Sequence, residues 1–428
     1  MTSQAHPLTS KLSCGPGKVA LVFLLAATLI GAGQNSAHAQ TFTLLHVFAG
    51  EDGAYPFGGL TLDGAGNLYG TTQGGVRGND YGNAFKLAHK GSGWVLAPLY
   101  YFTGGADGGE PESGLVIGPN GAFYSTTYGG GVSPYGVGTV FELTPPPTVC
   151  KSVLCYWNER VLYPFMGVPD AGLPGYADLI FDQAGNIYGT TAEQGANNKG
   201  AVYELSPSGE GWTERVIYSF TDGSDGGFPY GGVIQDVSGN LYGTAQGGGS
   251  DDCPFTCGTV YQLTSAGNSW TQSVIFSFTG STTGGQPQST LLMDPAGNLY
   301  GTTTYYGPDG GGTVFELTPS NGGWSFSLIA SFNCFVPVGV TMDSAGNLYG
   351  VCGGGGAYGD GWVFKLTHSN GTWLVHDLHD FSGSDGATPY APVTLDARGN
   401  IYGTTIAGGA VGTCYNNQGC GVVWEITP

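Results

Sequence analysis

Apolar and polar positions alternate along this chain in short runs, and each run is bounded by Gly, Asp, Asn or Pro, which is the pattern of β-strands joined by turns. One run, Gly-Asn-Leu-Tyr-Gly, returns along the chain, and its copies begin between 49 and 64 residues apart. The copies start at Gly66, Gly121 (as Gly-Ala-Phe-Tyr-Ser), Gly185, Gly239, Gly297, Gly346 and Gly399. A period of this size indicates an array of like units.

Each unit carries four strand signals, which in the first unit cover residues 58–63, 67–72, 83–88 and 94–102. An Asp-x-x-Gly turn joins the first two strands. The Asp carboxylate accepts hydrogen bonds from the turn, and Gly adopts the left-handed conformation that the turn needs. We therefore expect a structural role for these aspartates, which are Asp63, Asp182, Asp236, Asp294, Asp343 and Asp396.

Bulky aromatic residues recur at fixed strand positions, such as Tyr69 in the second strand and Phe85 in the third, and this predicts packing between neighbouring sheets. In the fourth strand a Trp is followed eight residues later by a Phe. The pairs are Trp94 and Phe102, Trp157 and Phe165, Trp212 and Phe220, Trp270 and Phe278, Trp324 and Phe332, and Trp373 and Phe381. Because side chains alternate along a strand, we expect the two residues of a pair to face the same side.

The number of strands predicts how the chain closes. The last unit ends after its third strand, at residues 422–428, and the missing fourth-strand pattern occurs at residues 41–48, with Phe48 in the Phe position. A linear solenoid would leave that N-terminal strand without a partner, whereas a ring pairs it with the last unit. The sequence therefore predicts an all-β fold, a single seven-bladed β-propeller of four-stranded blades over residues 40–428.

The first 39 residues have the features of a secretory signal peptide. Lys11 and Lys18 precede an apolar stretch at residues 19–32, and an Ala-x-Ala cleavage pattern ends at Ala39. We expect export to the periplasm or the cell exterior, and no later segment is apolar for long enough to span a membrane. In an oxidising compartment we expect four local disulfides, namely Cys150 with Cys155, Cys253 with Cys257, Cys334 with Cys352, and Cys414 with Cys420.

Composition narrows the classes of partner. The formal net charge of −20 repels phosphate backbones, so nucleic acid is not an expected partner. A neutral glycan, a protein or a cation fits this charge better, and simple solubility of an exported protein explains it equally well. We expect the protein to be a monomer.

The units resemble the GloVer-type tandem repeat of secreted bacterial proteins, through Gly-Asn-Leu-Tyr-Gly-Thr-Thr at residues 297–303 and Gly-Thr-Val-Phe-Glu-Leu-Thr at residues 312–318. The resemblance covers residues 41–428 and implies no particular chemistry. Many such proteins carry C-terminal sorting anchors, and this chain ends at Pro428 directly after a strand, so we expect release. At the level of fold the pattern is also similar to NHL and gluconolactonase-type propellers.

The loops between units read Phe-x-Gly-x-Asp-Gly-x-x-Pro with small variations. Their acidic position is occupied by Asp52, Asp107, Asp170, Asp225 and Asp385. A partial ring of carboxylates near a central channel would suit Ca²⁺, which takes six to eight oxygen ligands. In the alternative interpretation each Asp caps its own Gly-containing turn, and no cofactor is required.

The same set of loops carries the candidate ligand-binding aromatics, which are Tyr55, Tyr135, Tyr230, Tyr305, Tyr358 and Tyr390. Aromatic residues and Gly with few charges suit contact with a sugar ring or a peptide, and ordinary loop packing is the alternative.

Nucleophile, zinc-protease and phosphate-loop motifs are absent from the sequence, and no catalytic residue is assigned. The sequence therefore favours a non-enzymatic binding or surface-interaction module for a glycan or a protein. The alternatives are a Ca²⁺-dependent lactonase or lyase that uses the loop-rich face, and a purely structural extracellular protein.

Overall fold

The computed structural model describes residues 40–75, 81–91, 93–132, 136–147, 156–209, 211–267, 269–335, 339–409, 414 and 418–428. The predicted signal peptide, Tyr135 and the predicted Cys150–Cys155 pair lie outside these residues. Among the described residues no helix is long and apolar enough to cross a membrane.

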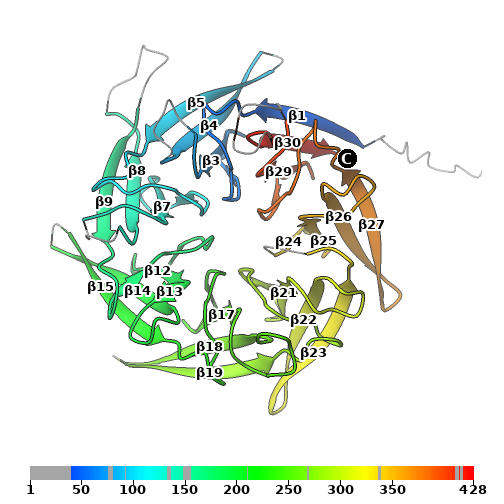
Figure 1. Cartoon of the computed structure of the whole chain (residues 1–428). Coiled ribbons are helices and arrows are strands. Elements are labelled where there is room, and N and C mark those ends of the chain that lie inside the picture. The colour runs from blue at the N-terminus through cyan, green and yellow to red at the C-terminus, as the bar shows by residue number, and fades with distance from the viewer. Residues whose placement is uncertain are drawn as a thin grey trace, which may run out of the picture. The chain divides into compact units, whose positions relative to one another are not determined.

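The unit Gln40–Pro428 is a ring of seven four-stranded antiparallel sheets, a seven-bladed β-propeller (Figure 1). The innermost strands are β2 (Thr61–Leu62), β6 (Val116–Ile117), β11 (Ile180–Phe181), β16 (Ile234–Gln235), β20 (Leu292–Met293), β24 (Thr341–Met342) and β28 (Thr394–Leu395). The second strands are β3 (Leu68–Thr72), β7 (Phe123–Thr127), β12 (Ile187–Thr191), β17 (Leu241–Ala245), β21 (Leu299–Thr303), β25 (Leu348–Cys352) and β29 (Ile401–Thr405).

The third strands are β4 (Asn83–Lys90), β8 (Thr139–Thr144), β14 (Ala201–Ser208), β18 (Thr259–Ala266), β22 (Thr313–Ser320), β26 (Trp362–Ser369) and β30 (Val422–Thr427). The outer strands are β5 (Gly93–Tyr101), β9 (Asn158–Pro164), β15 (Gly211–Ser219), β19 (Ser269–Ser277), β23 (Gly323–Ser331), β27 (Thr372–Asp380) and β1 (Thr41–Val47). A small extra sheet pairs β10 (Ala171–Gly172) with β13 (Glu193–Gln194) at the entrance to the third blade.

The chain closes as the sequence predicts. Strand β1 pairs antiparallel with β30, from Thr41 opposite Thr427 to Val47 opposite Val422, so the last sheet has the order β1-β30-β29-β28. Figure 1 shows the N-terminal strand lying on the outside of the C-terminal blade. Closure leaves no blade with a missing outer strand.

The apolar core lies between neighbouring blades, which confirms the predicted role of the recurring aromatics. Phe85 of β4 is fully buried, and its ring lies over Gly70 of β3 so closely that a Cβ there would come within 2.6 Å of it. The same contact joins Gly403 to Trp424, where the distance would be 2.3 Å. In these two blades the Gly leaves room for the buried ring, whereas the second blade has the small Ser125 at this position, opposite Phe141.

The prediction that the Trp and Phe of each outer strand face the same side is wrong. In β5, Tyr100 lies opposite Ala84 and Pro98 opposite Phe85, so Leu99 is an extra, bulged residue between them. The bulge shifts the alternation by one residue. Trp94 therefore packs into the core shared with the preceding blade, and Phe102 packs into the core shared with the following one.

Every outer strand carries this bulge, including the closing strand β1. The bulged residues are Leu45, Leu99, Leu162, Ile217, Ile275, Ile329 and Leu378. An apolar residue at this position lets one strand contribute to two cores, which ties each blade to both of its neighbours.

The Asp-x-x-Gly turns form tight hairpins between the first two strands of a blade. In the fifth blade, Asp294 accepts hydrogen bonds from the backbone nitrogens of Ala296 (2.8 Å) and Asn298 (2.9 Å) and from the Asn298 side chain (2.8 Å). The hydroxyl of Tyr300 also donates to it. We call Asp63, Asp182, Asp236, Asp294, Asp343 and Asp396 the hairpin carboxylates. The second unit, with Gly118 at this position, has none.

Candidate functional site

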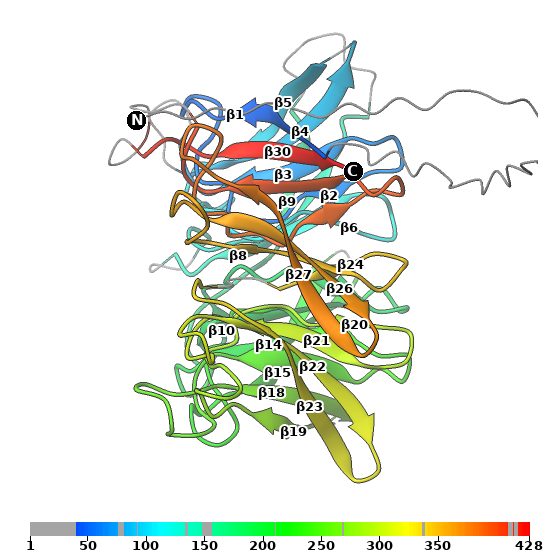
Figure 2. The ribbon, with the colours of Figure 1, turned by 90° about the vertical axis from the view of Figure 1, so that its right-hand side faces the viewer.

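Two sets of loops meet on one face of the propeller, the left-hand side in Figure 2. The loops that enter each blade pair with the loops between its second and third strands, for example through antiparallel bridges between Ala54 and Gly74 and between Gly227 and Gly247. Backbone hydrogen bonds hold them together, as from Gly227 nitrogen to Gly247 oxygen at 3.1 Å. This loop-rich face is therefore built from loops that support one another, and the hairpins occupy the opposite face.

The candidate metal-binding aspartates lie beside the outer strands. Asp107 accepts a hydrogen bond from the hydroxyl of Tyr100 in β5 (3.1 Å) and from the backbone nitrogen of Thr103 (2.9 Å). Asp225 is held in the same way, with Tyr218 at 2.9 Å and Thr221 nitrogen at 2.9 Å. In the structure each carboxylate caps its own turn and accepts a bond from the outer strand that precedes it.

His residues take the place of the Tyr at two of these turns. His46 bonds to Asp52 (2.8 Å), and His379 bonds to Asp385 (3.0 Å). Asp170 follows the Tyr pattern, with Tyr163 at 3.0 Å. All five candidate aspartates therefore have a donor on the outer strand.

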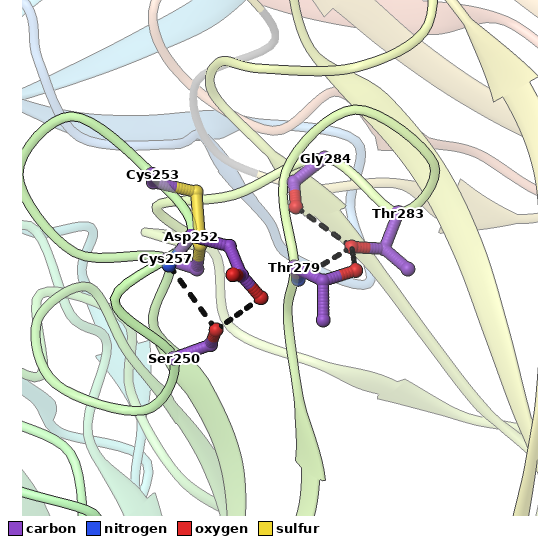
Figure 3. The surroundings of a disulfide bond; sticks show 7 residues. All are labelled: Ser250, Asp252, Cys253, Cys257, Thr279, Thr283 and Gly284. Atoms are coloured by element: carbon purple, nitrogen blue, oxygen red, sulfur yellow. Dashed lines mark hydrogen bonds between the residues drawn. A yellow bond between two sulfur atoms is a disulfide. The ribbon is translucent and has the colours of Figure 1, made fainter.

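The sequence departs from this pattern in a correlated way. Where Thr283 replaces the Asp, the donor on the outer strand is replaced by Phe276, which has no polar atom to satisfy. Thr283 still caps the turn through Thr279 nitrogen at 2.9 Å, as Figure 3 shows. This substitution pattern is the one expected of a turn cap. Among the residues that the structure describes, no group of three or more His, Cys, Asp or Glu could hold a metal, and Ca²⁺ binding by these loops stays a prediction.

A second kind of carboxyl group lies at the junctions between blades. Glu159 of β9 lies near Asp107 of the preceding loop, and burial followed by the charge of Asp107 raises the pKa of Glu159 to about 7. Glu214 of β15 has the same relation to Asp170, and burial followed by Asp170 raises its pKa to about 8. One oxygen of each Glu, Oε1, is buried without a hydrogen-bond partner among the described residues. We call Glu159 and Glu214 the junction carboxyls.

The candidate ligand-binding tyrosines fall into three environments. Tyr305 and Tyr358 stand on loops between second and third strands and are 43% and 67% exposed. Tyr55 packs against the core of the first blade. Tyr230 and Tyr390 lie at the axis of the ring, where their rings contact Tyr176.

The axial cluster contains residues that the sequence analysis missed. Tyr176 stacks on Phe57, with ring centroids 5.5 Å apart, and lies beside a cavity that Asp178 also lines. The sequence signal was available, because the segment from Pro174 to Leu179 is one residue longer than its counterparts in the other described blades, such as Pro56 to Leu60. This insertion is a departure from the repeat and lies outside its recurrent motifs.

A further buried acid lies close to this cluster. Glu112, on the entry loop of the second blade, accepts a hydrogen bond from the side-chain amide of Gln73 at 2.6 Å. Burial raises the pKa of Glu112 to about 7, and the nearby charge of Glu110 adds to this effect.

Disulfides fasten the loop-rich face. Bonds join Cys253 to Cys257, Cys334 to Cys352, and Cys414 to Cys420, as predicted. In Figure 3 the Cys253–Cys257 bridge lies directly after a turn in which the Ser250 hydroxyl donates to Asp252 at 2.6 Å. Short cross-linked loops of this kind restrict the backbone locally.

The sequence matches the family model of the Gloeobacter/Verrucomicrobia repeat over residues 34–160 and 157–339. A comparison with curated proteins found no match.

Several solved structures share the fold. PorZ, a bacterial surface component of the type-IX secretion system of Porphyromonas gingivalis, is 12% identical with a TM-score of 0.50, over 90% of this chain and 48% of PorZ. This chain thus spans about half of PorZ. A protein from Bacteroides uniformis assigned as a 6-phosphogluconolactonase is 14% identical, with a TM-score of 0.47, over 75% of this chain and 83% of that one. A protein assigned as a gluconolactonase is 11% identical with a TM-score of 0.42, over 91% and 92% of the two chains. At these identities the likeness shows the fold alone.

Proposed function

This chain belongs to the Gloeobacter/Verrucomicrobia repeat family, and we propose that it is a secreted, non-enzymatic binding module whose ligand contacts the loop-rich face. The observation that carries the proposal is the gathering of exposed aromatic side chains on the loops between second and third strands. Phe255 is 80% exposed, Tyr358 67%, Tyr305 43% and Tyr81 40%. Exposed rings on one face are typical of a contact surface.

The scaffold beneath these rings favours binding because it is ordered before a ligand arrives. Paired loops and three disulfides restrict the backbone, so little conformational entropy is lost on association. The disulfides also favour an oxidising compartment, in agreement with a signal peptide.

The ligand that we propose is a neutral glycan or a protein. The net charge of −20 disfavours polyanions, and tyrosine rings bind sugar faces and peptide side chains without requiring charge.

The alternative function, a Ca²⁺-dependent lactonase or lyase on the same face, has weaker support. Such an enzyme needs carboxylates that are free to bind metal or to move a proton. Asp107, Asp170 and Asp225 each already accept bonds from a Tyr hydroxyl and a backbone nitrogen.

A glycan array and a surface-protein pull-down with residues 40–428 would identify a ligand, and calorimetric titration would then measure its affinity. We expect the double variant Tyr305→Ala/Tyr358→Ala to weaken binding at least tenfold. The matched control is Leu374→Ala/Val375→Ala on outer strand β27, where the residues are 49% and 48% exposed, and this variant should bind normally.

Equal losses in both variants would contradict a site on the loop-rich face. Turnover of gluconolactone that depends on added Ca²⁺ and is lost in Asp225→Asn would replace the binding module with the enzymatic alternative.

A further inference from the structure

The segments that lead into the innermost strands, close to the axis of the ring, are not the same in all blades. The residue two positions before the innermost strand has no charge in six blades, where it is Gly59, Gly114, Gly232, Thr290, Gly339 or Pro392. In the third blade the same position is Asp178, and the segment that leads to it is one residue longer and carries Tyr176. Only the third blade has a carboxylate at this position, and Glu112, on the entry loop of the second blade, is the other acid close to the cluster.

Asp178 is partly buried, and one backbone donor contacts its carboxylate. Its Oδ1 accepts a hydrogen bond from the backbone nitrogen of Gly114 at 2.7 Å. Among the described residues no donor to its other oxygen is found. Burial raises the pKa of Asp178, and the bond from Gly114 opposes this only in part. An ionised group held in this way is stabilised by any cation that can reach it.

A cavity of about 50 Å³ lies next to Asp178, with Phe57, Tyr176, Gln288 and Thr290 among its lining residues. A water molecule needs roughly 10–15 Å³ by this measure, so the cavity has room for a few heavy atoms. Its walls come from several blades that are distant in the sequence, because each contributes the segment before its innermost strand.

Aromatic rings bound the cavity and cluster around it. Phe57 and Tyr176 both line the cavity, and their centroids are 5.5 Å apart. Tyr390 crosses both rings edge to face, at 5.6 Å from Phe57 and 5.4 Å from Tyr176, and its hydroxyl donates to the Gln288 side chain at 3.4 Å. Tyr176 also stacks with Tyr230, at 6.1 Å between ring centroids, and burial raises the pKa of Tyr176 above its usual range, so its phenol is neutral.

We propose that this axial cavity binds an organic ammonium group. The carboxylate of Asp178 would neutralise the charge, Tyr176 and Phe57 would contact the carbon-bound hydrogens, and the hydroxyl of Thr290 and the amide oxygen of Gln288 are polar groups within the lining. Ca²⁺ fits less well, because it takes six to eight oxygen ligands and part of this wall consists of aromatic rings. The site is separate from the exposed loop surface proposed above and does not depend on it.

The experiment is a titration of residues 40–428 with n-propylammonium and tetramethylammonium at constant ionic strength, followed by calorimetry and thermal unfolding. CaCl₂, NaCl and neutral n-propanol are the comparison solutes. We expect saturable binding and a raised Tm with an ammonium ion, and no saturable effect with the others.

Asp178→Asn keeps the size of the side chain and an acceptor for Gly114, so it should fold, with a free-protein Tm no lower than that of the parent. It should weaken ammonium binding at least tenfold, and Tyr176→Leu should weaken it about threefold to tenfold. Asp309→Asn, which changes the same charge at an exposed site, is the matched control and should bind as the parent does.

Ammonium binding that is unchanged in Asp178→Asn would overturn the proposal. So would a parent protein that saturates with Ca²⁺ but not with ammonium ions, or one that responds to none of the solutes. Binding of glycan or protein to the loop-rich face should be unaffected by Asp178→Asn, so failure of this proposal and failure of the proposed function are distinguishable.

Discussion

The hairpin carboxylates and the junction carboxyls belong to the same propeller and behave in opposite ways. Hydrogen bonds converge on Asp294 from its own turn. Although burial acts in the other direction, the bonds from Asn298, Ala296 and Tyr300 hold the pKa of Asp294 below its usual value. At the blade junction, Glu214 meets another carboxylate, Asp170, and its pKa rises to about 8.

The difference comes from where each kind of carboxyl group finds its contacts. A hairpin carboxylate finds its donors within six residues of the chain, so the same motif reproduces the same environment in each unit that carries it. The surroundings of a junction carboxyl depend on the residues of the neighbouring blade, which differ from one unit to the next. The position of Glu214, two residues after the strand Trp, is Leu96 in one blade and Phe326 in another. The repeated motifs therefore determine the structure of each blade. Sequence differences between units, where blades contact one another, produce carboxyl groups with raised pKa values.

The largest expected effect comes from removing a hairpin carboxylate. Asp294→Ala loses bonds from two backbone nitrogens, an amide and a hydroxyl at a half-exposed site, and we expect it to destabilise the fold by about 2 kcal/mol in urea unfolding. Asp309→Ala, at an exposed position, should change stability by less than about 0.5 kcal/mol. Equal stability of the two variants would contradict a structural role for the hairpin Asp.

The second prediction concerns pH, because the two classes of carboxyl have opposite linkage. Asp63, Asp236, Asp294 and Asp343 have lowered pKa values, so the stability they contribute is lost as pH falls through and below 3.8. Glu159 and Glu214 have raised values, so the folded state holds their protons more tightly, and stability is lost as pH rises from 4.5 towards 7 and 8.

Urea unfolding at pH 3.5, 5.5 and 8.5 tests this linkage. We expect a maximum near pH 5.5 and a loss of roughly 1 kcal/mol at pH 8.5, a figure reduced for solvent screening because both Glu side chains are partly exposed. Glu159→Gln/Glu214→Gln should reduce the loss of stability between pH 5.5 and pH 8.5, and the part that remains should come from Glu112, whose pKa is also raised to about 7. A profile that rises steadily to pH 8.5 would show that the junction carboxyls are not held close to the neighbouring acids.

The third prediction isolates one junction. Glu214→Gln removes a carboxylate that faces Asp170, so we expect it to stabilise the protein at pH 8.5 by about 0.5 kcal/mol, after allowance for screening, and to have no effect at pH 4. The matched control is Glu204→Gln on the adjacent strand, where the Glu pairs with Arg215 and the same substitution should destabilise. Destabilisation by both substitutions at pH 8.5 would argue against repulsion at the junction.

A smaller effect than that of Asp294→Ala should come from the hydroxyl that completes a hairpin. Tyr300→Phe removes the single hydroxyl proton that can be donated to Asp294 (3.3 Å) or to Glu316 (2.9 Å) and leaves the backbone donors in place. We expect a loss of about 0.5–1 kcal/mol in urea unfolding, clearly below that of Asp294→Ala. A loss as large as that of Asp294→Ala would mean that the Tyr hydroxyl, and not the turn backbone, supplies most of the stabilisation.

The sequence was sufficient to predict the blades, the turns and the closure of the ring. Each rests on a local pattern or on a count, and the pairing of Thr41–Val47 with Val422–Thr427 follows directly from the missing outer strand. The candidate site was less predictable. Tyr305 and Tyr358 are exposed as a ligand-binding role requires, whereas Tyr55 packs against a core.

The repeat, the number of blades and the residues that cap each hairpin follow from the amino-acid sequence alone, because they depend on neighbours within a few positions of the chain. The folded ring, in contrast, sets which way the outer-strand aromatics face, since the bulge at Leu99 is a property of strand pairing. It also decided that Glu214 meets Asp170 and that Asp178 and Tyr176 share a cavity with Phe57. The physical reason is that strand and turn formation are local free energies, whereas the burial, charge and cavities of a side chain depend on which distant residues the closed ring brings beside it.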